Sequence, residues 1–331
     1  GGVTGKPAKF YQSNNVWYKE MAYVYSYFES HGYEPPNLKA SFRGADFSNL
    51  KVDEYWKSNP HHYEINFSPF HINAFTVEKY VKKLNEIKPK FFHGYPSAFL
   101  SLAKFMEMSG LNLNYSPTCF FLISEGYTTK QIKFLESFFN CKMNSFYGQS
   151  ERVVFAKAFD NLENYQADQN YGYFELLDLE GNVIEENNKV GEIVATSYDN
   201  YAMPLIRYKT GDFTSYSNYQ NKTFKKISGK WGQLFLYGSE KEEISLTALN
   251  LHSTELNDII KIQFIQVDYG IVNVNVSFSC EIYDGVLASI ETLLSKRVGN
   301  KIMFNFLVSN DFKFNKRGKT PLIINLIKKV Q

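Results

Sequence analysis

The segment PKFFHGYPSAFLSLAKFMEMSG, residues 89–110, decides the fold that this sequence predicts. Its first part, PKFFHGY, is a short apolar run that breaks at a His-Gly pair, which is typical of a buried strand. Its second part begins with Pro96 and ends with Gly110, residue types that favour the start and the end of a helix. The segment therefore predicts a strand followed directly by a helix.

The alternation of strands and helices continues on both sides of this segment. We expect helices over 14–30 (ending before Gly32), 77–87 and 128–139, and strands over 38–44, 119–124 and 142–147. Strands that alternate with helices imply a parallel sheet. The sequence therefore predicts an α/β portion that extends to about residue 160.

The pattern changes in the second half of the chain. Strands joined by turns are expected over 171–182, 190–197 and 204–208, which indicates a β-rich subdomain to about residue 228. Strands near 258–280, a helix over 285–297 and strands near 301–309 and 322–327 then predict an α+β region. We expect two domains, 1–231 and 232–331, the first divided into an α/β portion and the β-rich subdomain.

Composition restricts the classes of function. At 331 residues the chain exceeds one domain of about 100–200 residues, and 44% apolar residues support real cores. The net charge of +2 gives no reason to expect nucleic acid or an anionic membrane as a partner. No apolar run approaches the roughly 20 residues of a membrane-spanning helix, and no signal-peptide pattern is visible. We expect a cytoplasmic protein.

The cysteines and paired histidines do not suggest a metal site. Cys119, Cys141 and Cys280 are widely spaced and show no metal-ligand pattern, so we expect reduced thiols in the core. His61 and His62 are adjacent in a polar loop and do not share a helix face.

Unusual loops follow three of the predicted strands. They are His93-Gly94-Tyr95-Pro96-Ser97, Ser124-Glu125-Gly126 and Tyr147-Gly148-Gln149-Ser150-Glu151. Open α/β sheets bind ligands at the carboxyl ends of their strands. Three such loops in succession predict a site there.

The chain opens with GGVTGKP, residues 1–7. A Gly-rich loop can direct backbone N–H groups toward a phosphate, although an ordinary turn has the same composition. It is not a Walker loop, because the spacing between Gly1 and Gly5 is too short and Pro7 follows Lys6.

Four motifs in order allow a family to be named. GGVTGKP, YGQSE (147–151), RYKTGD (207–212) and RGK (317–319) together resemble the adenylate-forming, or acyl-activating, enzymes. The stretches FFHGYPSAFLSLAKFM and GEIVATSYDNYAMPLIRYKTGD look most like the branch that contains phenylacetate–coenzyme A ligase and the CapK-like proteins of capsular polysaccharide gene clusters. The resemblance covers essentially the whole chain.

The resemblance implies an architecture and a reaction. The architecture is a large N-terminal portion, here lacking its first part, a flexible link and a small mobile C-terminal domain. In the reaction, a carboxylate attacks the α-phosphate of ATP to give an acyl-adenylate and pyrophosphate, and an acceptor such as coenzyme A takes the acyl group. Transfer to an amine or a sugar, or a catalytically silent nucleotide-binding homologue, remain alternatives.

Nucleotide-binding roles are implied by the same resemblance. Gly2, Thr4, Gly5 and Lys6 would form the phosphate loop, in which Val3 stands where a hydroxyl residue is usual. The YGQSE loop would contribute its residues to the nucleotide site, with Tyr147 stacking on adenine, Ser150 supplying a hydroxyl, Glu151 holding Mg²⁺, and Gly148 and Gln149 between them.

Further residues complete the expected site. Asp212 would bind both ribose hydroxyls, and Arg207 would pair with a phosphate or a carboxylate. Ser124, Glu125 and Gly126 would line the adenine pocket. His93, Gly94, Tyr95, Pro96 and Ser97 would form the wall of the acyl pocket, unless they serve only strand-to-helix geometry.

The resemblance also implies site residues in the small domain and in the link. Lys319 would enter the site for adenylation, as a point charge that bridges carboxylate and phosphate oxygens. The link reads Gly229-Lys230-Trp231-Gly232-Gln233 where the family carries G-R-x-D-D. Lys230 therefore replaces a bidentate Arg at a nucleotide-binding position, which leaves the second half-reaction open.

Overall fold

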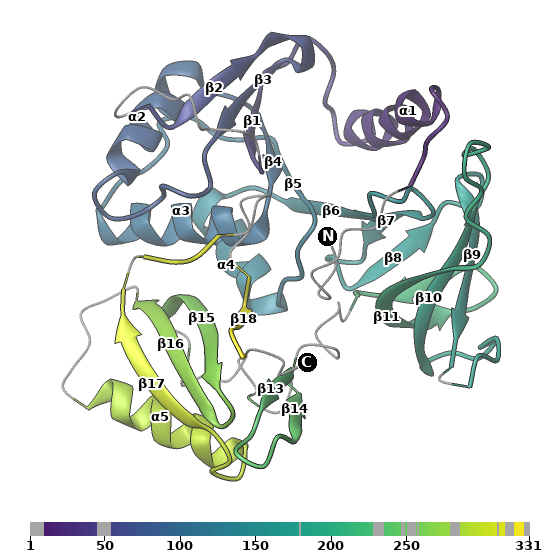
Figure 1. Ribbon diagram of the computed structural model, residues 1–331. Helices are drawn as coiled ribbons and strands as arrows, with labels where there is room; N and C mark the ends of the chain where they lie inside the picture. The colour runs from purple at the N-terminus through teal and green to yellow at the C-terminus, as the bar shows by residue number, and fades with distance from the viewer. Residues whose placement is uncertain are drawn as a thin grey trace.

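The computed structural model describes residues 10–44, 54–178, 180–227, 235–245, 249, 256, 258–278, 285–309, 311–314 and 321–327. A twelve-stranded sheet forms the larger part of this structure, and a four-stranded sheet forms the centre of a small C-terminal domain (Figure 1). No helix within these ranges is long and apolar enough to cross a membrane.

The first half of the large sheet is parallel, as predicted. Its parallel strands run in the order β3 (Glu64–Phe67), β1 (Lys39–Phe42), β4 (Phe91–Gly94), β5 (Cys119–Leu122) and β6 (Met143–Gly148). The edge strand β2 (Trp56–Asn59) pairs antiparallel with β3 and is followed by the short helix η1 (Pro60–His62). The sequence prediction did not include β2 or β3.

Helices cover both faces of the parallel strands. Packed against one face are α2 (Val77–Ile87), α3 (Pro96–Met108) and α4 (Thr129–Phe139), and against the other is α1 (Val16–Glu29). Successive side chains of a strand point to opposite faces of the sheet, so each strand contributes to two cores. Phe92 and Phe120 pack with α2, α3 and α4 in the three-helix core, and Phe91 and Phe121 pack with α1 in the α1 core. Cys119 and Cys141 are buried thiols, as expected.

The predicted β-rich subdomain continues the same sheet. Strand β6 pairs antiparallel with β7 (Phe155–Phe159), and the sheet then runs through β8 (Asn164–Ala167), β12 (Thr223–Lys225), β11 (Tyr208–Asn218), β10 (Val190–Ser197) and β9 (Gly172–Leu177). The two parts of the large portion are therefore joined by one hydrogen-bonded ladder.

Two strand predictions in this part were wrong in their extent. The strand expected over 204–208 begins only at Tyr208, because Arg207 has a left-handed backbone (φ +49°) and the preceding Ile206 is exposed. The strand expected over 171–182 ends at Leu177, where Asp178 accepts hydrogen bonds that close a turn to Asn182.

The small domain is α+β, as predicted. Its sheet has the order β17 (Met303–Val308), β16 (Ile271–Phe278), β15 (Ile259–Asp268) and β18 (Ile323–Asn325), and α5 (Val286–Arg297) packs on it. A hairpin of β13 (Phe235–Tyr237) and β14 (Glu243–Ser245) adds to the same core. The expected boundary at 231/232 lies outside the described residues.

Candidate functional site

The three predicted loops lie at neighbouring strand ends of the parallel sheet. Strands β4, β5 and β6 are consecutive in the sheet, and their carboxyl ends lead into the loops. Two hydrogen bonds join the first two loops: Ile123 N donates to Gly94 O (3.0 Å) and Ser97 N donates to Glu125 Oε2 (3.1 Å). The sheet therefore brings these loops together, as the sequence predicted.

Tyr147 and Asp212 meet through a hydrogen bond. The Tyr147 hydroxyl donates to Asp212 Oδ2 at 2.8 Å, across 65 residues of sequence. The Gln149 amide donates to the same hydroxyl. Burial, and then the negative charge of Asp212, raise the pKa of Tyr147 well above its usual value. The pair is therefore a neutral phenol beside a carboxylate.

Glu151 belongs to the same cluster of side chains. Its Oε1 accepts a hydrogen bond from the Tyr208 hydroxyl at 3.2 Å. Burial raises the pKa of Tyr208, and the charges of both Glu151 and Asp212 add to this effect. Two carboxylates from distant motifs thus act on one tyrosine, which places them in a single site.

A β-bulge gives Asp212 its position. Between the pairs Glu192–Phe213 and Val194–Lys209, strand β11 contains three residues opposite one of β10. Gly211 lies in this bulge with φ +74°, a conformation that favours glycine. Its N–H donates to Glu192 Oε1 (3.0 Å), so a carboxylate of the neighbouring strand fixes the bulge.

The turn that contains Glu151 is held from two sides. Arg152 N donates to Gln149 O (3.0 Å), which closes the turn, and Gln12 Nε2 donates to Ser150 O (3.3 Å). The charge of Arg152 acts on Glu20 of α1, a carboxylate whose pKa is raised by burial. Neither Gln12 nor Glu20 was predicted, since a single polar residue ahead of or within a helix gives no sequence signal.

Arg207 pairs with a carboxylate of the chain itself, and its predicted role in the nucleotide site remains a prediction. Its Nε lies 2.6 Å from Glu175 Oε1 and its Nη2 3.3 Å from Oε2, which is a bidentate contact. Glu175 is buried, whereas the Arg207 side chain is about half exposed. The guanidinium therefore compensates a buried charge on β9.

The residues predicted to form the acyl-pocket wall lie either at the end of β4 or at the start of α3. His93 is buried against Phe28 of α1, and burial lowers its pKa well below the usual value, so it is a neutral imidazole. Gly94 allows close strand pairing, because a Cβ there would lie 2.4 Å from Phe42 O. Tyr95 precedes α3, and its hydroxyl accepts a hydrogen bond from Gly44 N (2.9 Å).

The remaining residues of this loop begin a helix. Pro96 occupies the first position of α3, and the Ser97 amide in the same first turn donates a hydrogen bond to the Glu125 carboxylate. Ser124 has a left-handed backbone (φ +63°), which directs the chain toward Gly126 and α4. Structural roles therefore account for Gly94 and Pro96, while the Ser97 amide is hydrogen-bonded to the Glu125 side chain of the next loop.

The residues present fit a nucleotide with a divalent cation. Gln149 Oε1 is buried without a hydrogen-bond partner in the described part of the chain, next to the Tyr147–Asp212 pair, so an N–H or O–H group of a ligand would satisfy it. The described ranges contain no cluster of three or more His, Cys, Asp or Glu that could hold a metal ion. Glu151 could hold Mg²⁺ only together with ligand oxygens, a coordination that suits this ion.

Several predicted residues lie outside the described ranges. They are Gly2, Thr4, Gly5 and Lys6 of the opening loop, Lys230 of the link and Lys319 near the end of the chain. Their roles remain predictions.

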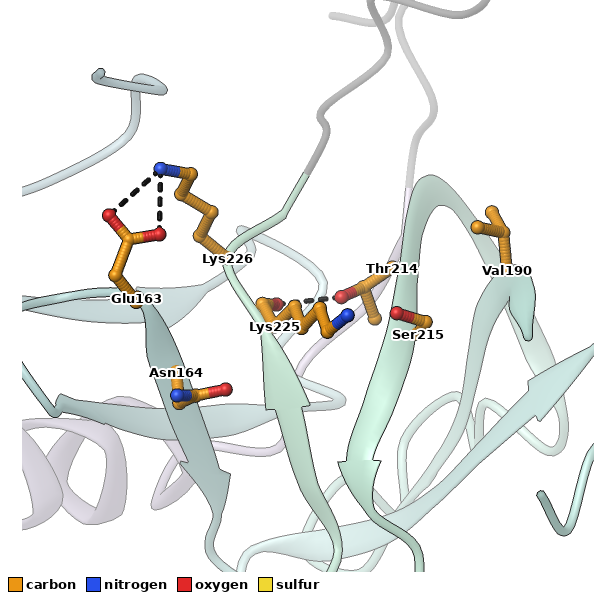
Figure 2. A pocket seen from close by; sticks show the side chains of 7 residues that line it. All are labelled: Glu163, Asn164, Val190, Thr214, Ser215, Lys225 and Lys226. Atoms are coloured by element: carbon orange, nitrogen blue, oxygen red, sulfur yellow. Dashed lines mark hydrogen bonds and ion pairs between the residues drawn. The ribbon is translucent and has the colours of Figure 1, made fainter. Parts of the chain in front are cut away.

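A cavity of about 560 Å³ lies elsewhere, on the antiparallel half of the large sheet (Figure 2). Its lining residues are Glu163, Asn164, Val190, Thr214, Ser215, Lys225 and Lys226. Figure 2 shows Lys226 paired with Glu163, and the Thr214 hydroxyl bonded to the Lys225 carbonyl. The cavity contains no predicted site residue and is a separate feature.

The fold and sequence of this chain are similar to those of known proteins. Its fold matches that of a 2-hydroxyisobutyryl-CoA ligase in the postadenylation state in complex with 2-HIB-AMP, with a TM-score of 0.70 and 17% identity over 98% of this chain and 72% of that one. It also matches an ATP-bound RpMatB-BxBclM chimera, with a TM-score of 0.61 and 12% identity over 95% and 64% of the two chains. The fold is therefore that of adenylate-forming ligases.

Within this class the chain is similar to CapK. Residues 236–326 match the model of the CapK C-terminal domain. The chain is 28% identical to Protein CapK of Staphylococcus aureus, over 99% of its own length and 74% of that protein. These findings confirm the resemblance to adenylate-forming enzymes and to CapK-like proteins that the four motifs predicted.

Proposed function

We propose that this chain activates a carboxylic acid with ATP and Mg²⁺, forming an acyl-adenylate and pyrophosphate. It then transfers the acyl group to an acceptor, for which coenzyme A is the first candidate. The observation that carries this proposal is a cluster of two hydrogen-bonded pairs, Tyr147 with Asp212 and Tyr208 with Glu151, in which the charge of Asp212 also acts on Tyr208. The cluster unites the two internal motifs of the predicted nucleotide site. The fold of ligases that were solved with 2-HIB-AMP or with ATP supports the same class of reaction.

Each side chain of the cluster has a chemical task in this proposal. ATP supplies an electrophilic α-phosphorus; the new bond joins a carboxylate oxygen of the acid to it, and the bond to pyrophosphate breaks. Asp212 accepts hydrogen bonds from the ribose hydroxyls, and the Tyr147 ring stacks on adenine. Glu151 shares Mg²⁺ with phosphate oxygens. Lys319 of the small domain stabilises the charge that gathers on the transferred group.

The acceptor has two candidates. Coenzyme A is supported by the fold, which the solved CoA ligases share. An amine or sugar acceptor, as in capsular polysaccharide synthesis, is supported by the similarity to CapK. Both candidates use the same first half-reaction, so one assay tests their common step.

The decisive experiment is carboxylate-dependent exchange of labelled pyrophosphate into ATP with a panel of acids. Exchange with at least one acid is the expected result. Glu151→Gln should reduce exchange by about 10- to 100-fold, because a charged ligand of Mg²⁺ is lost. Lys319→Ala should abolish exchange and leave ATP binding intact.

Glu185→Gln is the matched control for Glu151→Gln. Both carboxylates accept a hydrogen bond from a tyrosine; for Glu185 the donor is Tyr219, at 2.9 Å. Glu185, however, lies in an exposed segment without regular secondary structure. The control should retain full exchange. Normal ATP binding without exchange for any acid would instead indicate a silent homologue.

A further inference from the structure

Arg152 closes the turn that holds Glu151, and its backbone conformation there is unusual. Its φ is +55°, in the left-handed region that residues other than glycine, asparagine and aspartate seldom adopt. The hydrogen bond from Arg152 N to Gln149 O (3.0 Å) fixes this conformation. The turn therefore determines the direction in which the Arg152 side chain leaves the backbone.

The Arg152 guanidinium contains a buried donor without an acceptor. Its Nη1 is closed off from solvent and has no hydrogen-bond partner within the part of the chain that the structure describes. Leaving a buried N–H unpaired costs free energy, and the cost is greater for a charged group than for a neutral one. A ligand oxygen would satisfy this donor, and the positive charge favours an anionic oxygen such as that of a phosphate.

Glu20 of α1 does not satisfy this donor. Its Oε2 accepts a hydrogen bond from the Tyr171 hydroxyl, and its Oε1 lies 4.0 Å from the position that a Cβ on Gly148 would occupy. Burial raises the pKa of Glu20, and the charge of Arg152 opposes this shift. Among the described residues, however, no hydrogen bond or ion pair joins the two side chains. Glu20 therefore packs beside the turn and leaves Arg152 Nη1 unpaired.

Two other groups of this turn relate it to the phosphates of a nucleotide. Glu151, directly ahead of Arg152, is the predicted ligand of Mg²⁺, an ion that proteins bind through one or two carboxylates together with phosphate oxygens. Ser150 O accepts a hydrogen bond from Gln12 (3.3 Å), in the segment that follows the opening loop predicted to bind phosphate. The unpaired donor thus belongs to the part of the chain where phosphate oxygens are expected.

We propose that Arg152 is a catalytic residue of the first half-reaction, and that its Nη1 donates to a β- or γ-phosphate oxygen of ATP. This role rests on the proposed function. In that reaction a carboxylate oxygen of the acid forms a bond to the α-phosphorus, and the bond from this phosphorus to the bridging oxygen breaks. The electron pair stays on the leaving pyrophosphate, and no proton is transferred. The guanidinium remains charged throughout and stabilises the negative charge that the leaving group gains.

Calorimetric titration of the full chain with Mg·ATP and with AMP tests this role, because AMP lacks the β- and γ-phosphates. Arg152→Met should weaken binding of Mg·ATP by about 10- to 100-fold, since a charged hydrogen bond is lost, and should leave the affinity for AMP unchanged. Arg152→Lys keeps the positive charge and should recover part of the ATP affinity. Equal losses of affinity for ATP and AMP in Arg152→Met, or no loss for either, would overturn the proposal.

Two further variants separate this role from a purely structural one. Arg297→Met is the matched control, because its Nη1 donates to Leu249 O (3.0 Å) within the small domain, and it should bind both nucleotides as wild type does. In the double variant Arg152→Met/Glu20→Gln the buried carboxylate no longer needs a nearby positive charge. The double variant should still bind Mg·ATP weakly. Restored ATP affinity would show that Arg152 serves only to compensate Glu20, and would contradict the phosphate role.

The same titrations distinguish the failure of this role from the failure of the proposed function. If wild type binds neither Mg·ATP nor AMP, the proposed function fails and the role of Arg152 fails with it. If wild type binds both nucleotides and Arg152→Met keeps the same ratio of the two affinities, only the role of Arg152 is refuted. Urea unfolding of each variant confirms that the titrated protein is folded.

Discussion

At the scale of single residues, the Tyr147 hydroxyl is the centre of the candidate site. It donates to Asp212 and accepts from Gln149, and thereby fixes two side chains that come from different motifs. The ring and the hydroxyl have separate tasks, since the ring is expected to stack on adenine while the hydroxyl orients the carboxylate. A substitution that removes only the hydroxyl separates these tasks.

We expect Tyr147→Phe to weaken ATP binding about tenfold, because Asp212 loses the hydrogen bond that orients it toward the expected ribose position. Calorimetric titration with Mg·ATP measures the effect. Tyr80→Phe is the control, because its buried hydroxyl donates to Ser68 O (2.7 Å) in the three-helix core, far from the nucleotide motifs in sequence. Both variants should lose about 1 kcal/mol of unfolding free energy. Equal ATP affinity in the two variants would refute the role of the hydroxyl.

At the scale of elements, the bulge in β11 turns a regular strand into part of the site. Gly211 adopts a left-handed conformation there, and its amide is bonded to Glu192. The bulge changes the course of the strand between Lys209 and Phe213, within which Asp212 lies. Strand geometry alone would place successive side chains on alternate faces of the sheet, so the bulge decides where Asp212 points.

Gly211→Ala should destabilise the protein by about 1 kcal/mol, because alanine is strained in the left-handed region. It should also reduce ATP affinity by shifting Asp212. Gly181→Ala is the matched control: its φ is +88° and a Cβ there meets no atom within 4 Å, so the backbone penalty is similar but no site residue moves. Urea unfolding and ATP titration of both variants provide the comparison. An unchanged ATP affinity in Gly211→Ala would show that the bulge is not needed.

The sequence predicted elements with strong periodic or capping signals and missed those without them. The helix over 128–139 is confirmed as α4, with a capping box between Thr128 and Gln131. Strands β2 and β3 were missed because their faces are only partly buried. The start of β11 was misplaced because the left-handed Arg207 is invisible in a residue pattern.

The candidate site, like the fold, was predictable only in part. Motifs identified Tyr147, Glu151 and Asp212, which the structure brings together. The supporting contacts of Tyr208, Glu192 and Glu20 depend on side chains that meet only after folding. No spacing along the chain reveals such pairs, and the RYKTGD motif that contains Tyr208 predicted no role for this residue.

At the scale of the whole molecule, the cores of the large and small parts are distinct. The three-helix core and the core of the C-terminal domain share no buried residue among those described. Lys104, Ile260 and Phe314 mark the contact between the two parts. We therefore expect the two parts to unfold in separate steps.

Differential scanning calorimetry of two core variants tests this expectation. Leu102→Ala in α3 and Leu294→Ala in α5 both truncate fully buried leucines, and each should cost about 2–5 kcal/mol. Leu102→Ala should shift only the transition of the large portion, and Leu294→Ala only that of the small domain. A single transition shifted by both variants would indicate one cooperative unit.

The turn between β6 and β7 holds Glu151 and is also the point at which the large sheet changes from parallel to antiparallel pairing. An insertion there would displace the Glu151 carboxylate and also change the register between β6 and β7. Divergence among related proteins should therefore add length at exposed turns such as 178–182, and leave the 149–152 turn constant in length. Changes of acid or acceptor would then arise by substitution around this turn rather than by lengthening it.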